Sequence, residues 1–157
     1  MPITLTVNNT PYEYPTPNDP KGWGEPATGW ATEVTNLLAD LKGPNDIVQT
    51  AYSIANNQTS PTSVIGLQFD AATVRYAIVD YTIYLATSTT EIAEGGQIHL
   101  LYKNVANTWL IEVDRQGDAS GVVFSITNGG QLQYTSANIG GLSYTGKIGF
   151  RAKTLNQ

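Results

Sequence analysis

The amino-acid sequence predicts an all-β protein: a single antiparallel β-sandwich or jelly-roll-like domain, preceded by an extended proline-rich and aromatic arm and one short amphipathic helix. Charged residues make up 13% of the 157 residues, about half the roughly 25% that is usual in soluble domains. This composition disfavours long exposed helices. Helical periodicity occurs at only one place, and short apolar runs separated by turn residues fill the rest of the chain.

The N-terminal segment combines a weakly alternating run with a proline-rich stretch. Residues 3–14 contain the turn signal Asn8-Asn9, which predicts a small strand or hairpin. Five prolines lie between Pro11 and Pro26, and proline is excluded from helix interiors and central strands, so we expect an extended arm there. Its aromatic residues indicate that the arm lies on its own domain or on a partner. They are Tyr12, Tyr14 and Trp23.

Residues from about 28 to 41 have apolar side chains at steps of three and four, which predicts one amphipathic helix. Pro26 suits its start, and Gly43-Pro44 marks its end. Four apolar positions also fit a heptad seam through which identical helices meet on a symmetry axis. These candidate oligomer-interface residues are Trp30, Val34, Leu37 and Leu41. The alternative is that the helix packs on its own β-domain.

The pattern after Pro44 is all-β. Strands are predicted at residues 47–55, 64–69, 74–86, 97–103, 107–113, 122–127, 131–135 and 147–154. The run 74–86 is so continuously apolar that we expect both of its faces to be covered. The pairs Gly95-Gly96, Gly129-Gly130 and Gly140-Gly141 are interpreted as turns. Residues 1–44 are therefore predicted to form an arm and a helix, and residues 45–157 are predicted to form the sandwich.

Charge and composition exclude several function classes. The net charge is −5 and the chain has no cysteine and one histidine, which argues against nucleic-acid binding, zinc–cysteine sites and multi-histidine metal sites. No apolar run reaches the roughly 18 residues that a membrane span needs, and no export signal is apparent. We therefore expect no nucleic-acid partner and no membrane insertion.

The candidate catalytic groups have simpler interpretations. His99 lies on the polar side of its predicted strand, and the sequence places no nucleophile or orienting carboxylate beside it, so a solvent-facing imidazole is favoured over a general base. Asp114 and Asp118 flank a glycine-containing loop that lacks the EF-hand order, so a hairpin loop is favoured over a calcium site. Nothing in the sequence brings Asp70 and Asp80 together as a glycosidase pair. We expect no enzyme activity, no cofactor and no metal site.

A resemblance extends this interpretation. The segment TVNNTPYEYPTPNDPKGWGEPATGWATEVTNLLADL resembles a leader found in small virion proteins of tailed bacteriophages. The segments VRYAIVDYTIYLAT, GQIHLLYKN, GVVFSITNGGQLQYTS and GKIGFRAKTL resemble the β-domain that follows this leader. The resemblance implies a structural role on the particle exterior, as a head-decoration or head-fibre protein or as a small tail-fibre or knob component, usually trimeric.

Three functions follow from this resemblance and the composition. We expect a homotrimeric capsid decoration or head-fibre protein, attached to a capsid or other virion protein through Tyr12, Tyr14 and Trp23. The first alternative is a tail-fibre or knob protein that recognises host surface glycan through tyrosines on an exposed sheet face. The candidate tyrosines are Tyr81, Tyr84 and Tyr102. The second is a hydrolase or lyase on the same scaffold. A basic edge formed by Lys147, Arg151 and Lys153 is an alternative surface for docking on the particle.

Overall fold

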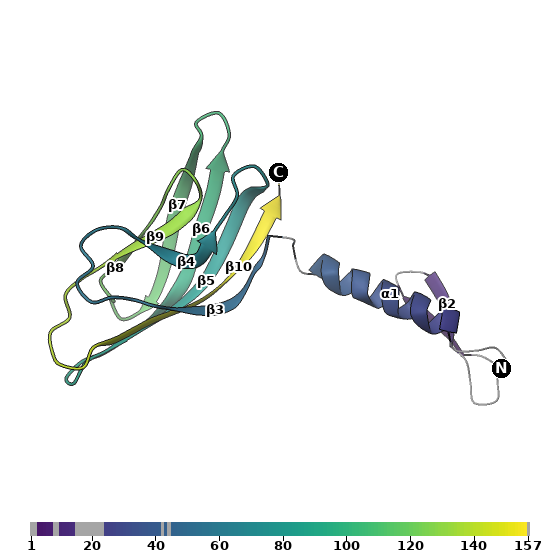
Figure 1. The fold of residues 1–157 in the computed structure, drawn as a ribbon, viewed down its shortest axis with the longest axis horizontal. Coiled ribbons are helices and arrows are strands. Elements are labelled where there is room, and N and C mark those ends of the chain that lie inside the picture. The colour runs from purple at the N-terminus through teal and green to yellow at the C-terminus, as the bar shows by residue number, and fades with distance from the viewer. Residues whose placement is uncertain (1–2, 8–9, 15–23, 42, 44, 157) are drawn as a thin grey trace. The chain divides into compact units, whose positions relative to one another are not determined.

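The chain forms two compact units, Met1–Gly43 and Pro44–Gln157. The structure, a computed structural model, describes residues 3–7, 10–14, 24–41, 43 and 45–156. Each unit is described by itself below, with the element labels of Figure 1.

The N-terminal unit contains a hairpin and a helix. Strands β1 (Ile3–Val7) and β2 (Thr10–Tyr14) pair in antiparallel register, with Ile3 opposite Tyr14. This confirms the predicted hairpin. The extended arm expected from residue 11 to residue 26 is therefore wrong at its start, where Pro11 is tolerated because a two-stranded hairpin consists of edge strands only. Helix α1 (Gly24–Leu41) contacts both strands.

The helix begins at Gly24, four residues before the predicted start at Thr28. Pro26 lies in its first turn, where the backbone N–H groups have no partner within the helix, so the missing N–H of proline costs no hydrogen bond. The end at Leu41 agrees with the prediction. In the described part of the chain, no helix is long and apolar enough to cross a membrane.

The C-terminal unit is a sandwich of two antiparallel sheets, which confirms the predicted fold class (Figure 1). One sheet has five strands in the order β3-β10-β5-β6-β7, and the other has three in the order β4-β9-β8. The strands are β3 (Ile47–Ser53), β4 (Thr62–Gln68), β5 (Val74–Ala86), β6 (Glu91–Lys103), β7 (Thr108–Gly117), β8 (Val122–Ile126), β9 (Gln131–Ser136) and β10 (Thr145–Asn156).

Strand β6 corrects one prediction. It begins at Glu91, six residues before the predicted start, and Gly95 and Gly96 lie inside it instead of in a turn. The reason is a close approach between strands: a Cβ atom on Gly96 would lie 1.9 Å from the carbonyl oxygen of Asp114. Glycine at position 96 thus allows the backbones of β6 and β7 to approach closely. A local sequence pattern cannot distinguish a glycine with this role from a glycine in a turn.

The core lies between the two sheets. Alternate residues of β5, β6, β8, β9 and β10 point into it, as expected for a sandwich. The five-stranded sheet contributes Ala77, Val79, Tyr81, Ile83, Leu85, Ile98, Leu100, Tyr102, Trp109, Ile148, Phe150 and Ala152, and the three-stranded sheet contributes Val64, Leu67, Val122, Phe124, Leu132 and Tyr134. The expectation that both faces of β5 are covered is wrong, because its other face, from Tyr76 to Tyr84, ranges from half-buried to exposed.

Candidate functional site

The outward surface of the five-stranded sheet is the candidate functional site, and we call it the open face. Its side chains form rows that cross β10, β5, β6 and β7 in that order. The apolar row is Leu155, Tyr76, Leu101 and Leu110; the second row is Lys153, Ile78, His99 and Glu112; the third row is Arg151, Asp80, Gln97 and Asp114. The members of each row face one another across adjacent strands.

Three leucines of the apolar row are exposed to solvent. Leu155 is 64% exposed, Leu101 is 41% exposed and Leu110 is 44% exposed. A shallow hollow over β6 and β7 is lined by Tyr76, His99, Leu101, Leu110, Ile111 and Glu112. Contiguous apolar side chains with polar neighbours are typical of interaction surfaces.

His99 belongs to a polar chain on the open face. The hydroxyl of Tyr76 lies 2.8 Å from Nδ1 of His99, and Nε2 lies 3.4 Å from Oδ2 of Asp114. His99 lies on the outward side of its strand, as predicted, but its two partners come from the neighbouring strands and could not be recognised from the local sequence pattern. The Asp114 side chain is exposed, so water competes for its hydrogen bonds, unlike the buried carboxylate that orients a catalytic histidine.

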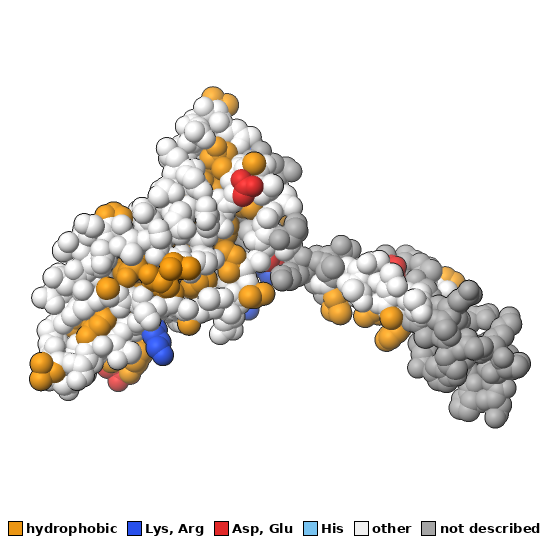
Figure 2. All heavy atoms as spheres, in the orientation of Figure 1, with side chains coloured by type: hydrophobic (Ala, Val, Ile, Leu, Met, Phe, Trp, Pro, Cys, Tyr) orange, Lys and Arg blue, Asp and Glu red, His pale blue; other side chains and the backbone are white. Residues whose placement is uncertain are grey.

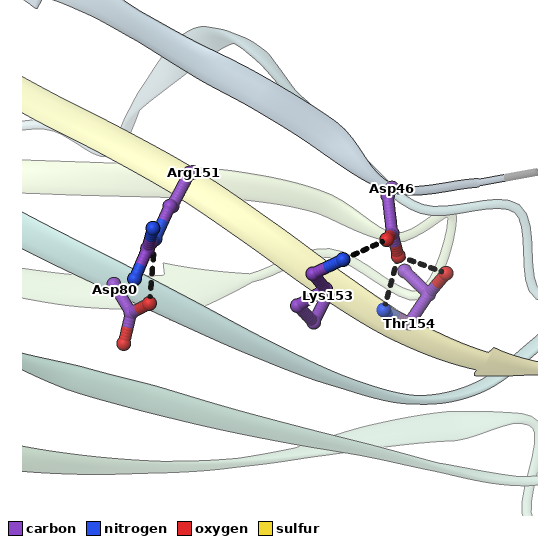
Figure 3. Close-up of polar contacts among 5 residues, drawn as sticks. All are labelled: Asp46, Asp80, Arg151, Lys153 and Thr154. Carbon is purple, nitrogen blue, oxygen red and sulfur yellow. Dashed lines mark hydrogen bonds and ion pairs between the residues drawn. The ribbon is translucent and has the colours of Figure 1, made fainter. Parts of the chain in front are cut away.

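Two carboxylates contact two of the three basic side chains of β10, Arg151 and Lys153 (Figure 3). Arg151 Nε donates to Oδ2 of Asp80 over 2.9 Å, and Gln97 donates to Oδ1 over 2.8 Å. The hydrogen bond from Gln97, followed by that from Arg151, lowers the pKa of Asp80 below its ordinary value. These contacts join β10, β5 and β6 across the third row.

The second carboxylate, Asp46, anchors the chain where it enters the sandwich (Figure 3). Its Oδ1 accepts hydrogen bonds from the backbone nitrogen and the hydroxyl of Thr154, at 2.7 and 3.1 Å, and its Oδ2 lies 2.9 Å from Nζ of Lys153. The Asp46 side chain is only 6% exposed. The segment before β3 is therefore fixed to the end of β10.

Charge is unevenly distributed over the two sheets. On the open face Lys147, Arg151 and Lys153 point outward from β10, Lys103 lies at the end of β6, and the acidic residues Glu112 and Asp114 lie on β7. Strands β4, β8 and β9 contain no charged residue. Over the second and third rows the β10 side of the open face is thus basic and the β7 side is acidic, whereas the opposite sheet is neutral along its strands.

Glu94 is a buried carboxylate that the sequence analysis did not single out. It accepts hydrogen bonds from the Tyr81 hydroxyl at 2.8 Å and from the Ser120 backbone at 3.0 Å, and Arg115 Nε lies 3.6 Å away. Burial and the hydrogen bond to Glu94 raise the pKa of Tyr81 to about 12. These contacts connect β5, β6 and the loop after β7, and they give both oxygens of the buried Glu94 side chain a hydrogen-bond partner.

Three of the four helix residues predicted to form an oligomer interface are exposed or half-buried. Trp30 is 38% exposed, Val34 and Leu37 are half-buried, and neighbouring Leu38 is 60% exposed. Leu41 ends the helix, and its side chain lies outside the described residues. Figure 2 shows hydrophobic side chains gathered along one side of this helix.

The predicted attachment residues lie largely outside the described structure. Tyr12 and Tyr14 belong to β2, but their side chains are not among those described. Trp23 lies entirely outside the described residues.

Of the three candidate glycan-contacting tyrosines, two are excluded. Tyr81 and Tyr102 are buried in the core, where Tyr102 donates to Asn107 over 2.6 Å. Only Tyr84 is exposed. The run 74–86 alternates inward and outward, so the choice between Tyr81 and Tyr84 depended on which face packs against the second sheet.

The side chains of Asp114 and Asp118 do not come together to form a cation site in the loop after β7. Asp114 lies within β7, and Asp118 accepts a hydrogen bond from the backbone of Ala93 on β6 over 3.0 Å. Over the described residues, no three histidine, cysteine, aspartate or glutamate side chains are grouped so that they could hold a metal ion.

Neither a protein-family model nor a curated protein sequence matches this chain. Among solved structures, the chain is similar to part of the tailspike protein of Acinetobacter phage vB_ApiP_P1, with a TM-score of 0.37 and 12% sequence identity. The similarity covers 69% of this chain and 19% of the tailspike chain.

Proposed function

We propose that this protein is a non-enzymatic structural component of a bacteriophage virion: a homotrimeric capsid decoration or head-fibre protein that lies on the particle exterior. The observation that carries the proposal is the apolar stripe of α1, on which Trp30 and Leu38 remain exposed in a unit separate from the sandwich. Such a stripe needs a partner, and three identical helices around an axis cover it. The resemblance of the leader and the β-domain to phage virion proteins supports the location.

In this proposal the two units have different tasks. The N-terminal unit attaches to a capsid or other virion protein, with Tyr12, Tyr14 and Trp23 as contacts, and the sandwich is displayed. Docking through the basic edge is the alternative, in which Arg151 and Lys153 would keep their contacts with Asp80 and Asp46. Of that edge only Lys147 has no ion-pair partner among the described residues.

The test uses the full chain and particles that lack it. We expect light scattering to show a trimer and co-sedimentation to show binding to the particles. Val34→Asp should dissociate the trimer, because an unpaired carboxylate in an apolar interface costs several kcal/mol. Deletion of residues 2–20 should abolish particle binding and leave the sandwich folded. A monomeric wild-type chain, or particle binding that survives the deletion, would refute the corresponding part of the proposal.

A small tail-fibre or knob protein that recognises host surface glycan is the second candidate. It is favoured by one observation, the exposed ring of Tyr84 opposite Lys147 on the open face. An aromatic ring beside a polar hydrogen-bonding group is a suitable surface for a sugar. Binding of the full chain to host cells that Tyr84→Ala abolishes, with no binding to particles lacking the protein, would favour this candidate over the first.

A further inference from the structure

On the open face, two outward residues of β10 and two of β7 carry opposite charges at corresponding positions. On β10 the outward residues run Leu155, Lys153, Arg151, and on β7 they run Leu110, Glu112, Asp114. The register across β5 and β6 places Leu155 at the level of Leu110, Lys153 at the level of Glu112, and Arg151 at the level of Asp114. At each level the two sides are therefore complementary: apolar with apolar once, and basic with acidic twice.

We propose that the open face is an interface between copies of this chain, in which the β10 side of one copy packs against the β7 side of the next. If the partner had a different sequence, the β10 and β7 sides of this chain would not need to be complementary to each other. If the partner is a second copy, its β7 side contacts the β10 side of the first, so the two sides must be complementary row by row. Contacts between two different patches produce a closed ring when the rotation between neighbouring copies is a whole fraction of a full turn. That this ring contains three copies rests on the proposed function.

The apolar level supplies the packing contact. Leu155 is 64% exposed on β10, and the hollow over β6 and β7 has an apolar part formed by Leu101 and Leu110 beside its polar lining. Seating Leu155 of one copy in the hollow of the next removes apolar surface from water on both sides, which is the main source of association energy.

The charged levels set the direction of the contact. The side chains of Arg151 and Lys153 are each 66% exposed, although each already contacts a carboxylate of its own chain. A guanidinium has five N–H donors and an ammonium has three, so both can contact a further carboxylate from Glu112 or Asp114 of a neighbouring copy. Packing β10 against β10 or β7 against β7 at equal levels would instead bring like charges together.

Disulfide cross-linking of the full chain tests this interface directly, because the protein has no cysteine. Positions 110 and 155 lie on strands separated by two others, about 14 Å apart at the usual strand spacing, which is too far for a disulfide within one chain. In the Leu110→Cys/Leu155→Cys variant, mild oxidation should therefore join neighbouring copies. We expect a ladder on non-reducing gels that ends at three chains.

Two controls make the result specific. Leu110→Cys combined with Val123→Cys, which places the second thiol on β8 of the other sheet, should give no ladder. Adding Glu112→Lys to the cross-linking variant should slow the reaction by at least about tenfold, because this substitution brings like charges together at the level of Lys153. Val123→Lys in place of Glu112→Lys should leave the rate unchanged. Circular dichroism checks that each variant is folded.

The outcomes separate this inference from the proposed function. Absence of cross-links in a chain that light scattering shows to be trimeric would overturn this interface and leave the proposed trimer in place. A ladder that ends at another number of chains would support the interface and overturn the trimer. Cross-linking that is insensitive to Glu112→Lys would overturn the proposed pairing of charges.

Discussion

The hydroxyl of Tyr81 donates a hydrogen bond of 2.8 Å to Oε1 of Glu94 inside the sandwich. The other oxygen of this buried carboxylate accepts the backbone N–H of Ser120. A buried carboxylate is tolerated only when its oxygens have such partners. Tyr81, Glu94 and Ser120 therefore depend on one another, although they come from two strands and a loop.

Replacing Glu94 by alanine should lower the free energy of unfolding by about 2–4 kcal/mol, because the Tyr81 hydroxyl and the Ser120 N–H lose their acceptor. Denaturant unfolding followed by tryptophan fluorescence measures this loss. Glu91→Ala, at an exposed position at the start of the same strand, should change the free energy by no more than about 0.5 kcal/mol. Equal losses in the two variants would contradict the role of Glu94.

The stability should also fall at alkaline pH. The pKa of Tyr81 is raised from 10.0 to about 12 in the folded chain, so the folded state retains the phenol proton that the unfolded chain releases earlier. The contribution is fully present below pH 10 and is lost as pH rises toward 12. Unfolding free energies measured over this range should have a smaller pH dependence in Tyr81→Phe than in the wild-type chain.

Gln97 should control the acidity of Asp80. Its hydrogen bond is the largest cause of the lowered pKa of this carboxyl, so Gln97→Ala should raise the pKa toward 3.8. Because the folded pKa is lowered, the stabilisation by Asp80 is present above pH 3.8 and is lost as pH falls below it. NMR titration of the Asp80 carboxyl carbon measures the change. Gln116→Ala, nearby on the same face, should leave the titration unchanged.

The close approach at Gly96 should make this glycine irreplaceable. Gly96→Ala places a Cβ atom 1.9 Å from the carbonyl oxygen of Asp114, so β6 and β7 must separate locally, at a cost of about 2 kcal/mol or more. Gly140→Ala is the matched control, because a Cβ atom there would have no neighbour within 4 Å. Thermal unfolding of both variants should show a large loss for the first and little change for the second.

Residues 45–157 should fold alone. The fragment retains the core and the hydrogen bonds from Thr154 to Asp46 that fix the start of β3. We expect a cooperative thermal transition and a β-type circular dichroism spectrum. Asp46→Ala in this fragment should lower the free energy of unfolding by about 1–3 kcal/mol. An insoluble or unfolded fragment would show that the sandwich depends on the N-terminal unit.

Local patterns determined which elements the chain contains. The run Val74–Ala86 is rich in β-branched and aromatic residues, and β5 has the predicted bounds. The helix was recognisable because Trp30, Val34 and Leu37 repeat at helical spacing, and its end at Leu41 was marked by the glycine that follows. These features depend on side-chain periodicity and backbone preferences over a few residues, which a sequence displays directly.

Only the tertiary structure decided what each face of those elements contacts. The tyrosines of β5 alternate between the core and the open face, and the packing of the second sheet buried Tyr81 and left Tyr84 exposed. Gly96 resembles a turn residue in its local sequence. Glycine is needed there because a Cβ atom would collide with the carbonyl oxygen of Asp114 on another strand. The rows that align Lys153 with Glu112 arise from strand order and register, which are set by contacts between residues far apart in the chain.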